Sequence, residues 1–237
     1  MPFERLLELQ DVDTRIAQLT HRRDQHPARA ALSEAIATRD RLDAEAVELF
    51  AQRDEIRQAQ QRFEDEAALT DEKIAKVSDT LYGGAVTSPK ELESLQHELA
   101  MLKERRGSFD ESALEQMELA EPLDAAAAEL DERRSAAVDD VAAKEAELTI
   151  ALAVLGAELD AATSQRDELA AGIDADLLAR YERIRSAAGG QGVARLAAGG
   201  RCEGCHLTLP RAEYDTLKHA PADEVHLCPE CGRILVR

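Results

Sequence analysis

Four cysteines form the strongest chemical pattern in the sequence. Cys202 and Cys205 make one C-x-x-C pair and Cys228 and Cys231 make another, with 22 residues between Cys205 and Cys228. Two residues between cysteines let both thiolates point into one turn, and two such turns complete the tetrahedron that Zn²⁺ adopts with sulfur ligands. A closed shell of four protein ligands leaves no position for water or substrate. We therefore predict one Zn²⁺ ion with a structural role.

Iron binding, disulfide formation and redox chemistry are the alternatives to zinc at the four cysteines. Rubredoxin-like iron takes the same four ligands, and spacing alone does not separate it from zinc. Disulfides are not expected in a chain without a visible secretory signal. A thioredoxin-like redox pair occurs near a βαβ pattern, which the sequence lacks. His206 and His226 flank the cysteine pairs. With four thiolates present, we expect these histidines near the metal ligands or at the surface rather than on the metal.

The cysteines lie in a segment with the composition of a small separate domain. Glycines cluster in AAGGQGVARLAAGGR, so we place the domain boundary near Gly189 and the C4 zinc ribbon over residues 189–237. Gly204 and Gly232 are expected to supply the flexible backbone of the cysteine turns. Short strand-like runs surround these turns, at 193–196, 207–209, 225–227 and 234–236. They predict a small antiparallel ribbon that the metal holds together, with a helical turn over 211–218.

Long helices must make up most of the remaining chain. Ala, Leu, Glu, Lys and Arg supply 130 of the 237 residues, which is typical of coiled coils, whereas aromatic residues are only 3% and Trp is absent. One large compact core is therefore not expected. No apolar run approaches the ~20 residues that a membrane span needs. We expect a cytoplasmic protein without a membrane partner.

Apolar residues recur at heptad spacing in two halves of the chain. The rows run from Leu42 to Val77 and from Ala46 to Leu81 in the first half, and from Val141 to Leu169 and from Glu145 to Ile173 in the second half. Such a seam is buried against a helical partner. Several seam positions are Arg, Gln, Glu or Ala, so the predicted packing is uneven.

A stop and a start lie between the two halves. Gly83 and Gly84 end the first helix, while Ser88, Pro89 and Glu91 form the start signal of the second. A turn over about 82–88 brings the second helix back antiparallel to the first. The predicted fold is mostly α, with a long antiparallel coiled-coil helical hairpin over residues 1–173 and a small C-terminal β zinc ribbon.

Three further signals interrupt the helices. Pro27 and Pro122 lie inside the arms, and an interior proline removes a backbone hydrogen bond, so we expect kinks or short breaks there. Gly172 followed by Asp174 resembles another stop and start. A short linking helix is predicted within 174–188, at about 175–187.

The turn motif and the two cysteine pairs together resemble a known family. LYGGAVTSPKELESLQHEL, GRCEGCHLTLP and CPECGRILVR are similar to segments of the bacterial C4-type zinc-ribbon coiled-coil proteins. The resemblance covers nearly the whole chain and implies a long antiparallel hairpin with a terminal zinc ribbon. It also implies that some members regulate flagellar gene expression or act as chaperone-like adaptors, binding sigma-54 through the rod and RNA with help from the ribbon. We carry over the architecture and the metal site, not these partners.

Charge separates two hypotheses about binding. Residues 1–188 hold 23 basic and 42 acidic residues and so carry the whole net charge of -19, whereas residues 189–237 hold six of each. The predicted function is a non-enzymatic, zinc-binding regulatory adaptor that contacts nucleic acid, proteins or both through the ribbon and the rod. Contact with RNA or DNA would use the basic residues of the ribbon, which are Arg195, Arg201, Arg211, Lys218, Arg233 and Arg237. The even charge of the ribbon and its single aromatic residue, Tyr214, do not favour this hypothesis.

The alternative is a scaffold or chaperone-like factor that binds only proteins. The turn offers Tyr82, Val86, Lys90 and Leu92 as a contact at the tip of the hairpin, although Tyr82 and Val86 are equally expected to pack on each other. An enzyme is not predicted, because the sequence has no phosphate-binding glycine motif, nucleophile elbow or histidine-rich open metal site. The protein partner is unidentified, and both a monomer and a homodimer are compatible with the sequence.

Overall fold

The computed structural model describes residues 2–221 and 224–237. The chain forms two compact units: unit 1 comprises Met1–Ala30 with Glu145–Arg237, and unit 2 comprises Ala31–Lys144. The boundaries of the units differ from those of the predicted hairpin and ribbon. Unit 1 includes the first helix and the end of the third helix together with the ribbon.

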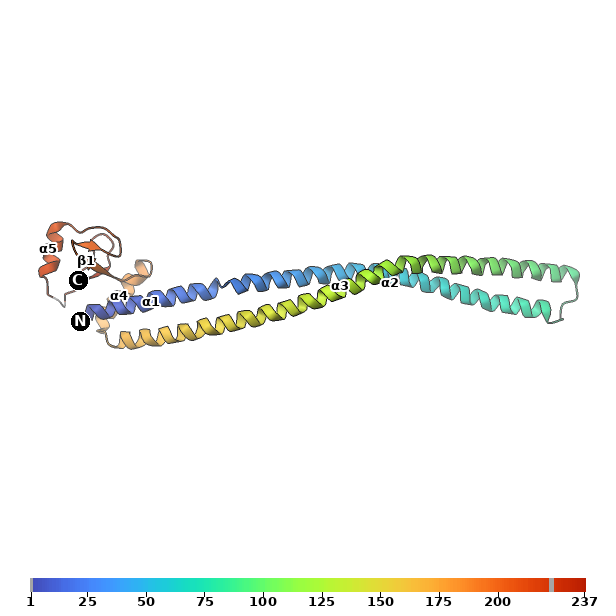
Figure 1. The fold of residues 1–237 in the computed structure, drawn as a ribbon, viewed down its shortest axis with the longest axis horizontal. Helices are drawn as coiled ribbons and strands as arrows, with labels where there is room; N and C mark the ends of the chain where they lie inside the picture. Colours follow the sequence, from blue (N-terminus) through green and yellow to red (C-terminus); the bar gives the residue numbers. More distant parts are fainter. Residues whose placement is uncertain (1, 222–223) are drawn as a thin grey trace. The chain divides into compact units, whose positions relative to one another are not determined.

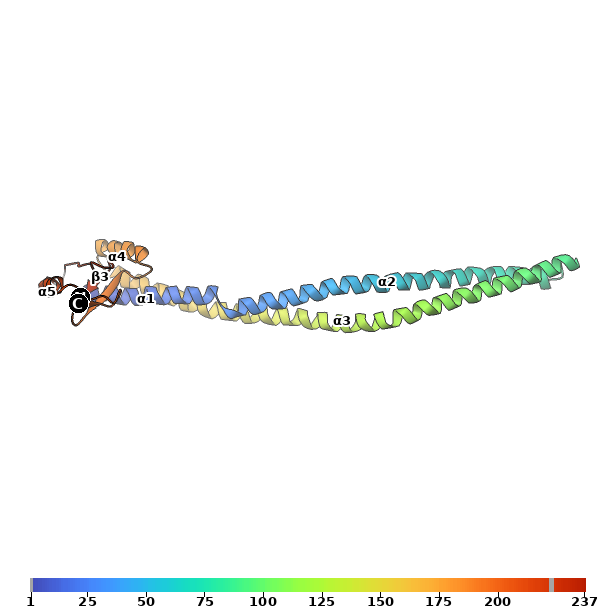
Figure 2. The same cartoon turned by 90° about the horizontal axis from the view of Figure 1, so that it is seen from above.

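Unit 2 is an antiparallel pair of helices. It is built from α2 (Pro27–Tyr82) and the first part of α3 (Pro89–Ala171), which lie side by side in both ribbon views (Figures 1 and 2). The amide of Gly83 donates to the carbonyl of Asp79 at 2.8 Å, and Gly84 takes a positive φ of 76°. Ser88 directly precedes α3, as the start signal predicted. The turn between the helices therefore lies where the sequence placed it.

Both predicted heptad rows of α2 face the partner helix. Leu42, Ala46, Ala67, Thr70 and Leu81 are buried, and the other members of the two rows are half-buried. On α3 the row that contains Val141 continues toward the N-terminus at intervals of seven residues. Its upstream buried members are Leu99, Ala113, Ala120 and Ala127. Three of these four are alanines, which explains why apolar periodicity did not reveal this part of the seam.

Ion pairs cross between the two helices of unit 2. Arg134 pairs with Asp43 at 2.7 Å, Arg106 pairs with Asp71 at 3.3 Å, and Arg57 pairs with Asp124. Their side chains are a third or more exposed, so each pair stabilises the fold only modestly. Their main effect is to favour one register of α2 against α3.

The two interior prolines have different outcomes. The chain leaves the helix after α1 (Pro2–Asp24), and Pro27 becomes the first residue of α2, where a missing amide costs nothing. At Pro122 no break occurs, because α3 continues through it. Pro122 is exposed, so water can solvate the carbonyl that loses its hydrogen bond.

In unit 1, α1 packs on the last part of α3. Val12 and Leu19 of α1 form one buried cluster with Leu155 and Ala162 of α3. In the predicted second row of this half, Glu145 is exposed, the members from Leu152 to Arg166 are half-buried, and only Ile173 is buried.

The predicted linking helix is present as α4 (Ala175–Ala187). The Asp174 carboxylate caps it by accepting hydrogen bonds from the amides of Asp176 at 3.0 Å and Leu177 at 3.1 Å. Such a cap satisfies amides that have no partner within the helix. The stop at Gly172 and the start at Asp174 thus agree with the sequence pattern.

Within its described residues, 189–221 and 224–237, the ribbon contains a three-stranded sheet and one helix. The strands β1 (Val193–Ala197), β2 (Arg201–Cys202) and β3 (Ile234–Val236) lie in the order β2-β1-β3, and α5 (Arg211–His219) lies in the connection (Figure 1). β1 pairs antiparallel with β2 but parallel with β3, so the prediction of a wholly antiparallel ribbon is wrong. A parallel pair needs a long crossover, and residues 198–233 provide one.

The two faces of this sheet belong to two different cores. Val193, Ile234 and Val236 pack with α1 residues, among them Leu6 and Leu9. Ala194 and Leu235 instead pack with Cys202, Cys228, Leu209 and Leu217 on the metal side. The alternation follows from the twofold period of a strand. No described helix is both long and apolar enough to cross a membrane.

Candidate metal centre

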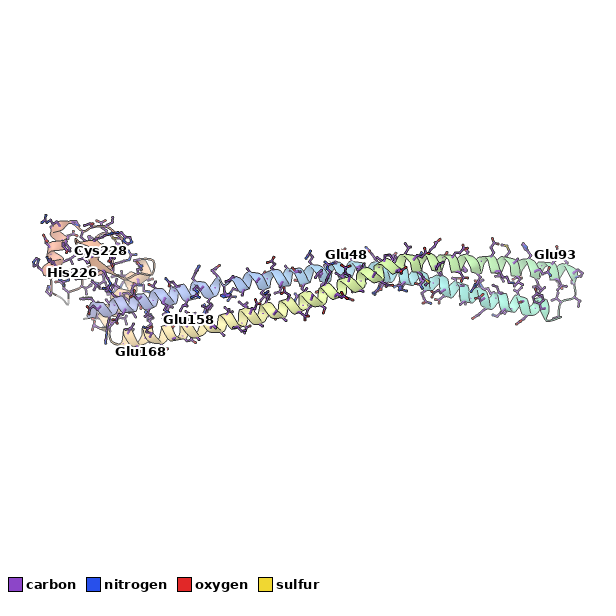
Figure 3. The ribbon with its side chains drawn as sticks, in the orientation of Figure 1. Glu48, Glu93, Glu158, Glu168, His226 and Cys228 are labelled. Atoms are coloured by element: carbon purple, nitrogen blue, oxygen red, sulfur yellow. The ribbon has the colours of Figure 1, made fainter. Side chains whose placement is uncertain are left out.

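The four cysteines come together at one point of the ribbon. Their Sγ atoms all lie within 4.8 Å of one another, with 3.9 Å between Cys202 and Cys231 and 3.8 Å between Cys205 and Cys228. Tetrahedral zinc with Zn–S bonds of about 2.3 Å places sulfur atoms about 3.8 Å apart. The donor set therefore fits one structural Zn²⁺ ion. Figure 3 marks the place of Cys228 in the ribbon.

The two cysteine turns repeat the same backbone geometry. The amide of His206 donates to the Cys202 carbonyl at 2.8 Å, and the amide of Gly232 donates to the Cys228 carbonyl, also at 2.8 Å. Both donor residues have positive φ, 62° for His206 and 71° for Gly232. The left-handed position of the first turn is thus occupied by histidine, which costs backbone strain that glycine avoids.

Gly204 has a different role from the one predicted. It does not adopt a positive φ. A Cβ atom at this position would lie 2.8 Å from Cδ of Arg233 and 3.0 Å from Cβ of Ala194. Glycine is needed there for space, because the second cysteine turn and β1 approach closely.

The surroundings of the thiols shift their pKa values in opposite directions. Burial raises the pKa of Cys202, and it raises the pKa of Cys228 to about 12 although backbone amides oppose the shift. Burial also acts to raise the pKa of Cys231, but the backbone amide and the guanidinium of Arg233 outweigh it and lower the pKa to about 7. Zinc must therefore displace protons from Cys202 and Cys228, whereas Cys231 is already partly a thiolate at neutral pH.

The histidines lie outside the ligand group. Among residues 2–221 and 224–237, the four cysteines are the only group of three or more ligand side chains within such distances. His206 is exposed, and His226 is half-buried with its Nε2 atom 3.8 Å from Glu224. Their positions beside the cysteine turns match the expectation from sequence.

Two of the six predicted binding cations hold the ribbon together. Arg233 donates to the carbonyls of Ala188 at 3.0 Å and Gln191 at 3.2 Å. Arg237 donates to three carbonyls at the end of α5, including that of Ala220 at 3.0 Å. The other four basic residues are exposed, and they are Arg195, Arg201, Arg211 and Lys218. Contact of these six side chains with nucleic acid stays a prediction.

The predicted tip residues differ in exposure. Tyr82 is 75% exposed and Lys90 is exposed, while Val86 and Leu92 are half-buried. The Tyr82 ring is thus largely uncovered, which is not what close packing on Val86 would produce. A partner contact at the tip stays a prediction.

A buried carboxylate, missed from sequence, joins α1 to the elements that lead into the ribbon. Asp13 of α1 is 1% exposed and accepts a hydrogen bond from the Tyr181 hydroxyl at 2.7 Å. Arg166 of α3 donates to Asp13 at 2.7 Å, and Nε of Arg185 lies 3.3 Å from it. Both arginines also pair with Glu182. Burial and the bond to Asp13 raise the pKa of Tyr181, so its phenol stays protonated.

Gln10 forms a second polar connection from α1. Its side chain is buried, and its Nε2 atom donates to the Gly190 carbonyl at 3.0 Å while its Oε1 atom accepts from the Gly192 amide at 2.6 Å. The primary amide thus pairs with the backbone immediately before β1. The signal for both residues was a polar side chain inside the apolar stripe that runs from Leu6 to Leu19.

Comparisons with known proteins agree with this architecture. The model of the CT398-like coiled coil hairpin domain matches residues 9–189, and that of the C4-type zinc ribbon domain matches residues 201–235. Uncharacterized protein Rv2229c of Mycobacterium tuberculosis is 35% identical over 98% of this chain and 94% of its own length.

Two solved structures share the fold. One from Mycobacterium smegmatis has a TM-score of 0.86 at 29% identity, covering 99% of this chain and 96% of that one. CT398 from Chlamydia trachomatis has a TM-score of 0.67 at 19% identity, with the same coverage. Coiled-coil hairpins and C4 ribbons of these families are typically non-enzymatic. The chain belongs to the family of CT398-like coiled-coil hairpin proteins that carry a C4-type zinc ribbon.

Proposed function

We propose that the protein is a non-catalytic adaptor whose zinc ribbon contacts a protein partner. The observation that carries this proposal is an apolar groove of about 430 Å³ between α5 and the second cysteine turn. Its apolar lining includes Leu209, Leu217, Leu227 and Pro229. Leu227 is 40% exposed, and Leu207 of the first cysteine turn is 52% exposed. An apolar surface bordered by polar residues, here Glu213, Thr216 and His226, is typical of a protein contact.

The metal supports this groove without taking part in chemistry. Leu209 and Leu217 pack in the same core as Cys202 and Cys228, so the wall of the groove and the zinc ligands share one cluster. When bound, zinc supplies crosslinks that this small core lacks. Four protein ligands leave no open coordination position, which favours binding over catalysis.

A nucleic-acid contact at the ribbon is the weaker candidate. Arg233 and Arg237 already donate to backbone carbonyls, and six acidic residues balance the six basic ones. Tyr214 is half-buried against the metal-side core, where a Cβ atom on Gly200 would lie 3.0 Å from its ring, so only part of the ring faces solvent. Nucleic-acid binding needs clustered cations, and base-stacking platforms need exposed rings.

The family resemblance implied sigma-54 as a partner of some members. We do not assign that partner to this chain, because the resemblance rests on the architecture and the metal site. A transcription-associated role remains one outcome of the experiment below.

The test compares two variants of the zinc-loaded, full-length protein. One replaces the apolar residues (Leu207→Ser with Leu227→Ser), and the other replaces the four exposed cations (Arg195, Arg201, Arg211 and Lys218, each by Ala). Proteins crosslinked to each form in the native host are identified by mass spectrometry, and RNA and DNA binding is measured at low salt. Circular dichroism and the zinc content confirm that both variants fold.

The proposal expects a protein crosslink that the apolar variant loses and the cation variant keeps. It also expects little nucleic-acid binding by any form. Nucleic-acid binding that the cation variant loses and the apolar variant keeps, without a specific protein crosslink, would overturn the proposal.

A further inference from the structure

The negative charge of unit 2 is concentrated in one section. Residues 107–132 of α3 hold nine acidic and no basic side chains, and residues 45–70 of α2 hold seven acidic and three basic ones. Ion pairs at either end, Arg133 with Glu45 and Arg106 with Asp71, show that these two stretches lie opposite each other. We call them together the acidic section. Glu48, which Figure 3 labels, belongs to it.

The remaining parts of unit 2 are nearly neutral. Residues 71–106, which include the turn, hold seven acidic and six basic side chains. Residues 31–44 and 133–144 together hold five of each. Glu93, which Figure 3 labels near the turn, lies in a neutral part. Nearly all of the net charge of the unit therefore comes from the acidic section.

Most acidic side chains of residues 107–132 form no ion pair with the described residues. Asp110, Asp124 and Asp131 pair with Arg106, Arg57 and Arg134. The six glutamates are exposed and make no ion pair with the described residues, and they are Glu111, Glu115, Glu118, Glu121, Glu129 and Glu132. Like charges this close repel one another, so the section gains stability when a cation approaches.

Apolar side chains interrupt the charge on one side of α3. Leu114 is 56% exposed and Met117 is 48% exposed, and at a spacing of three residues they share a helix face. They line a groove of about 380 Å³ together with Arg57, Glu118, Glu121 and Asp124. Because Arg57 pairs with Asp124 across the helices, the groove spans both α2 and α3. Met117 can adapt its shape to different apolar partners.

We propose that this groove binds a basic amphipathic helix of a partner protein. Apolar side chains of that helix would cover Leu114 and Met117, while its Lys or Arg side chains would pair with Glu118 and Glu121. The proposal extends the adaptor role to a second surface, in unit 2, and shares with the proposed function only the assumption of a protein partner.

Charge complementarity favours this occupant over others. A second copy of the chain also carries a net charge of -19, so the two copies would repel each other where their acidic sections approach. Nucleic acid would be repelled by the same field. Self-association through this face and RNA binding are therefore outcomes that the test must distinguish.

The test measures binding of defined peptides to the full-length, zinc-loaded protein. The probe is a fluorescent helical peptide of about 18 residues, five turns, with leucines at spacings of three and four and lysines elsewhere. A matched peptide carries serine in place of every leucine. Anisotropy titrations at two salt concentrations give the affinities. A photo-reactive version of the first peptide, followed by mass spectrometry, locates the contact.

Four variants separate the two parts of the groove from general charge effects. Glu118→Gln with Glu121→Gln removes charge, and Leu114→Ser with Met117→Ser removes apolar surface. The matched controls lie on the same helix in the neutral parts: Glu93→Gln with Glu98→Gln, and Met101→Ser with Val138→Ser. Met101 and Val138 are each 53% exposed, close to Leu114 and Met117.

The wild type should bind the leucine peptide about tenfold more tightly than the serine peptide, since apolar area is buried only with the former. The charge variant should weaken binding about threefold to tenfold and the apolar variant about tenfold, with crosslinks in residues 107–132. Both control variants should bind as the wild type does. The ribbon variant Leu207→Ser with Leu227→Ser should also bind normally, so failure of the adaptor proposal at the ribbon leaves this test intact.

Three results would overturn the proposal. Equal affinity for both peptides, or equal loss in groove and control variants, would show general polyelectrolyte attraction. Sedimentation equilibrium that finds a dimer, which the apolar variant disrupts, would assign the face to self-association. RNA binding that the apolar variant loses would assign the face to nucleic acid.

Discussion

Removal of the buried Asp13 carboxylate should loosen α4 and the start of the ribbon from α1. Asp13 receives a hydrogen bond from Tyr181 at 2.7 Å and one from Arg166, also at 2.7 Å. Tyr181 is fully buried, so in Asp13→Ala its hydroxyl would have no acceptor and no access to water. An unpaired buried hydroxyl costs about 1–3 kcal/mol.

Removal of the Asp13 negative charge lowers the stability of unit 1 further. Breaking a buried ion pair typically costs about 3–5 kcal/mol, because the remaining charge is left without compensation. Here Arg166 and Arg185 retain Glu182 and are about a quarter exposed, which reduces the penalty. We therefore expect a loss of about 3 kcal/mol in unit 1, near the lower end of that range. Asp13→Asn keeps one acceptor oxygen and should lose less.

Hydrogen exchange of α4 amides measures this loss locally, since a chain of two units need not unfold in one step. A loss of about 3 kcal/mol corresponds to exchange about 100-fold faster. Asp43→Ala is the control, because it removes an Arg–Asp pair across helices whose side chains are 34% and 45% exposed, far more than Asp13. It should leave α4 exchange unchanged. If α4 in Asp13→Ala exchanges within about threefold of the wild type, the buried network does not hold this joint.

Three further outcomes follow from the metal centre and its surroundings. Zinc binding at pH 7 should release at least the two protons of Cys202 and Cys228, because burial raises the pKa of both thiols. Affinity should therefore fall as the pH falls; calorimetry in buffers of different ionisation enthalpy counts the protons, and fewer than one would contradict these pKa directions. Gly192→Ala should destabilise unit 1 by about 1–3 kcal/mol, since the new Cβ atom would lie 2.7 Å from the Tyr181 ring, whereas Gly156→Ala, with open space and a helical backbone, should stabilise it in the same denaturation assay. His206→Val should weaken zinc binding about tenfold through strain at φ 62°, and His206→Gly should not; equal affinities in a chelator competition would show that this backbone position is unstrained.

Features encoded by neighbouring residues could be predicted from the sequence. The cysteine pairs, the turn at Gly83 and Gly84, the heptad rows and the start of α4 at Asp174 each depend on spacings of a few residues. Such patterns report local backbone geometry and one buried face, so they predicted the metal ligands and the hairpin correctly. The alanines of the α3 seam could not be recognised as buried, because alanine is common on both faces of a helix.

The remaining features depend on residues far apart in the chain. Asp13 meets Tyr181, 168 residues later, and Gln10 meets Gly192, 182 residues later. No spacing rule connects such positions, although a polar residue within an apolar stripe marked both on α1. The same applies to Arg233 and Arg237. The sequence does not reveal whether a basic side chain donates its hydrogen bonds to backbone carbonyls or to water. The parallel pairing of β1 with β3 likewise joins strands that a long crossover separates in the sequence.

The sheet of the ribbon connects the metal-side core to the residues of α1 on which the ribbon packs. Val193 and Ile234 pack toward α1, while their neighbours Ala194 and Leu235 pack toward the cysteines. Arg233 lies beside this sheet, lowering the pKa of Cys231 and donating to the Ala188 carbonyl at the end of α4. Strands that are buried on both faces lose order on both when one core is removed. Zinc therefore stabilises the attachment of the ribbon to α1 as well as the ribbon itself, and chelation should raise α4 exchange together with that of the cysteine turns.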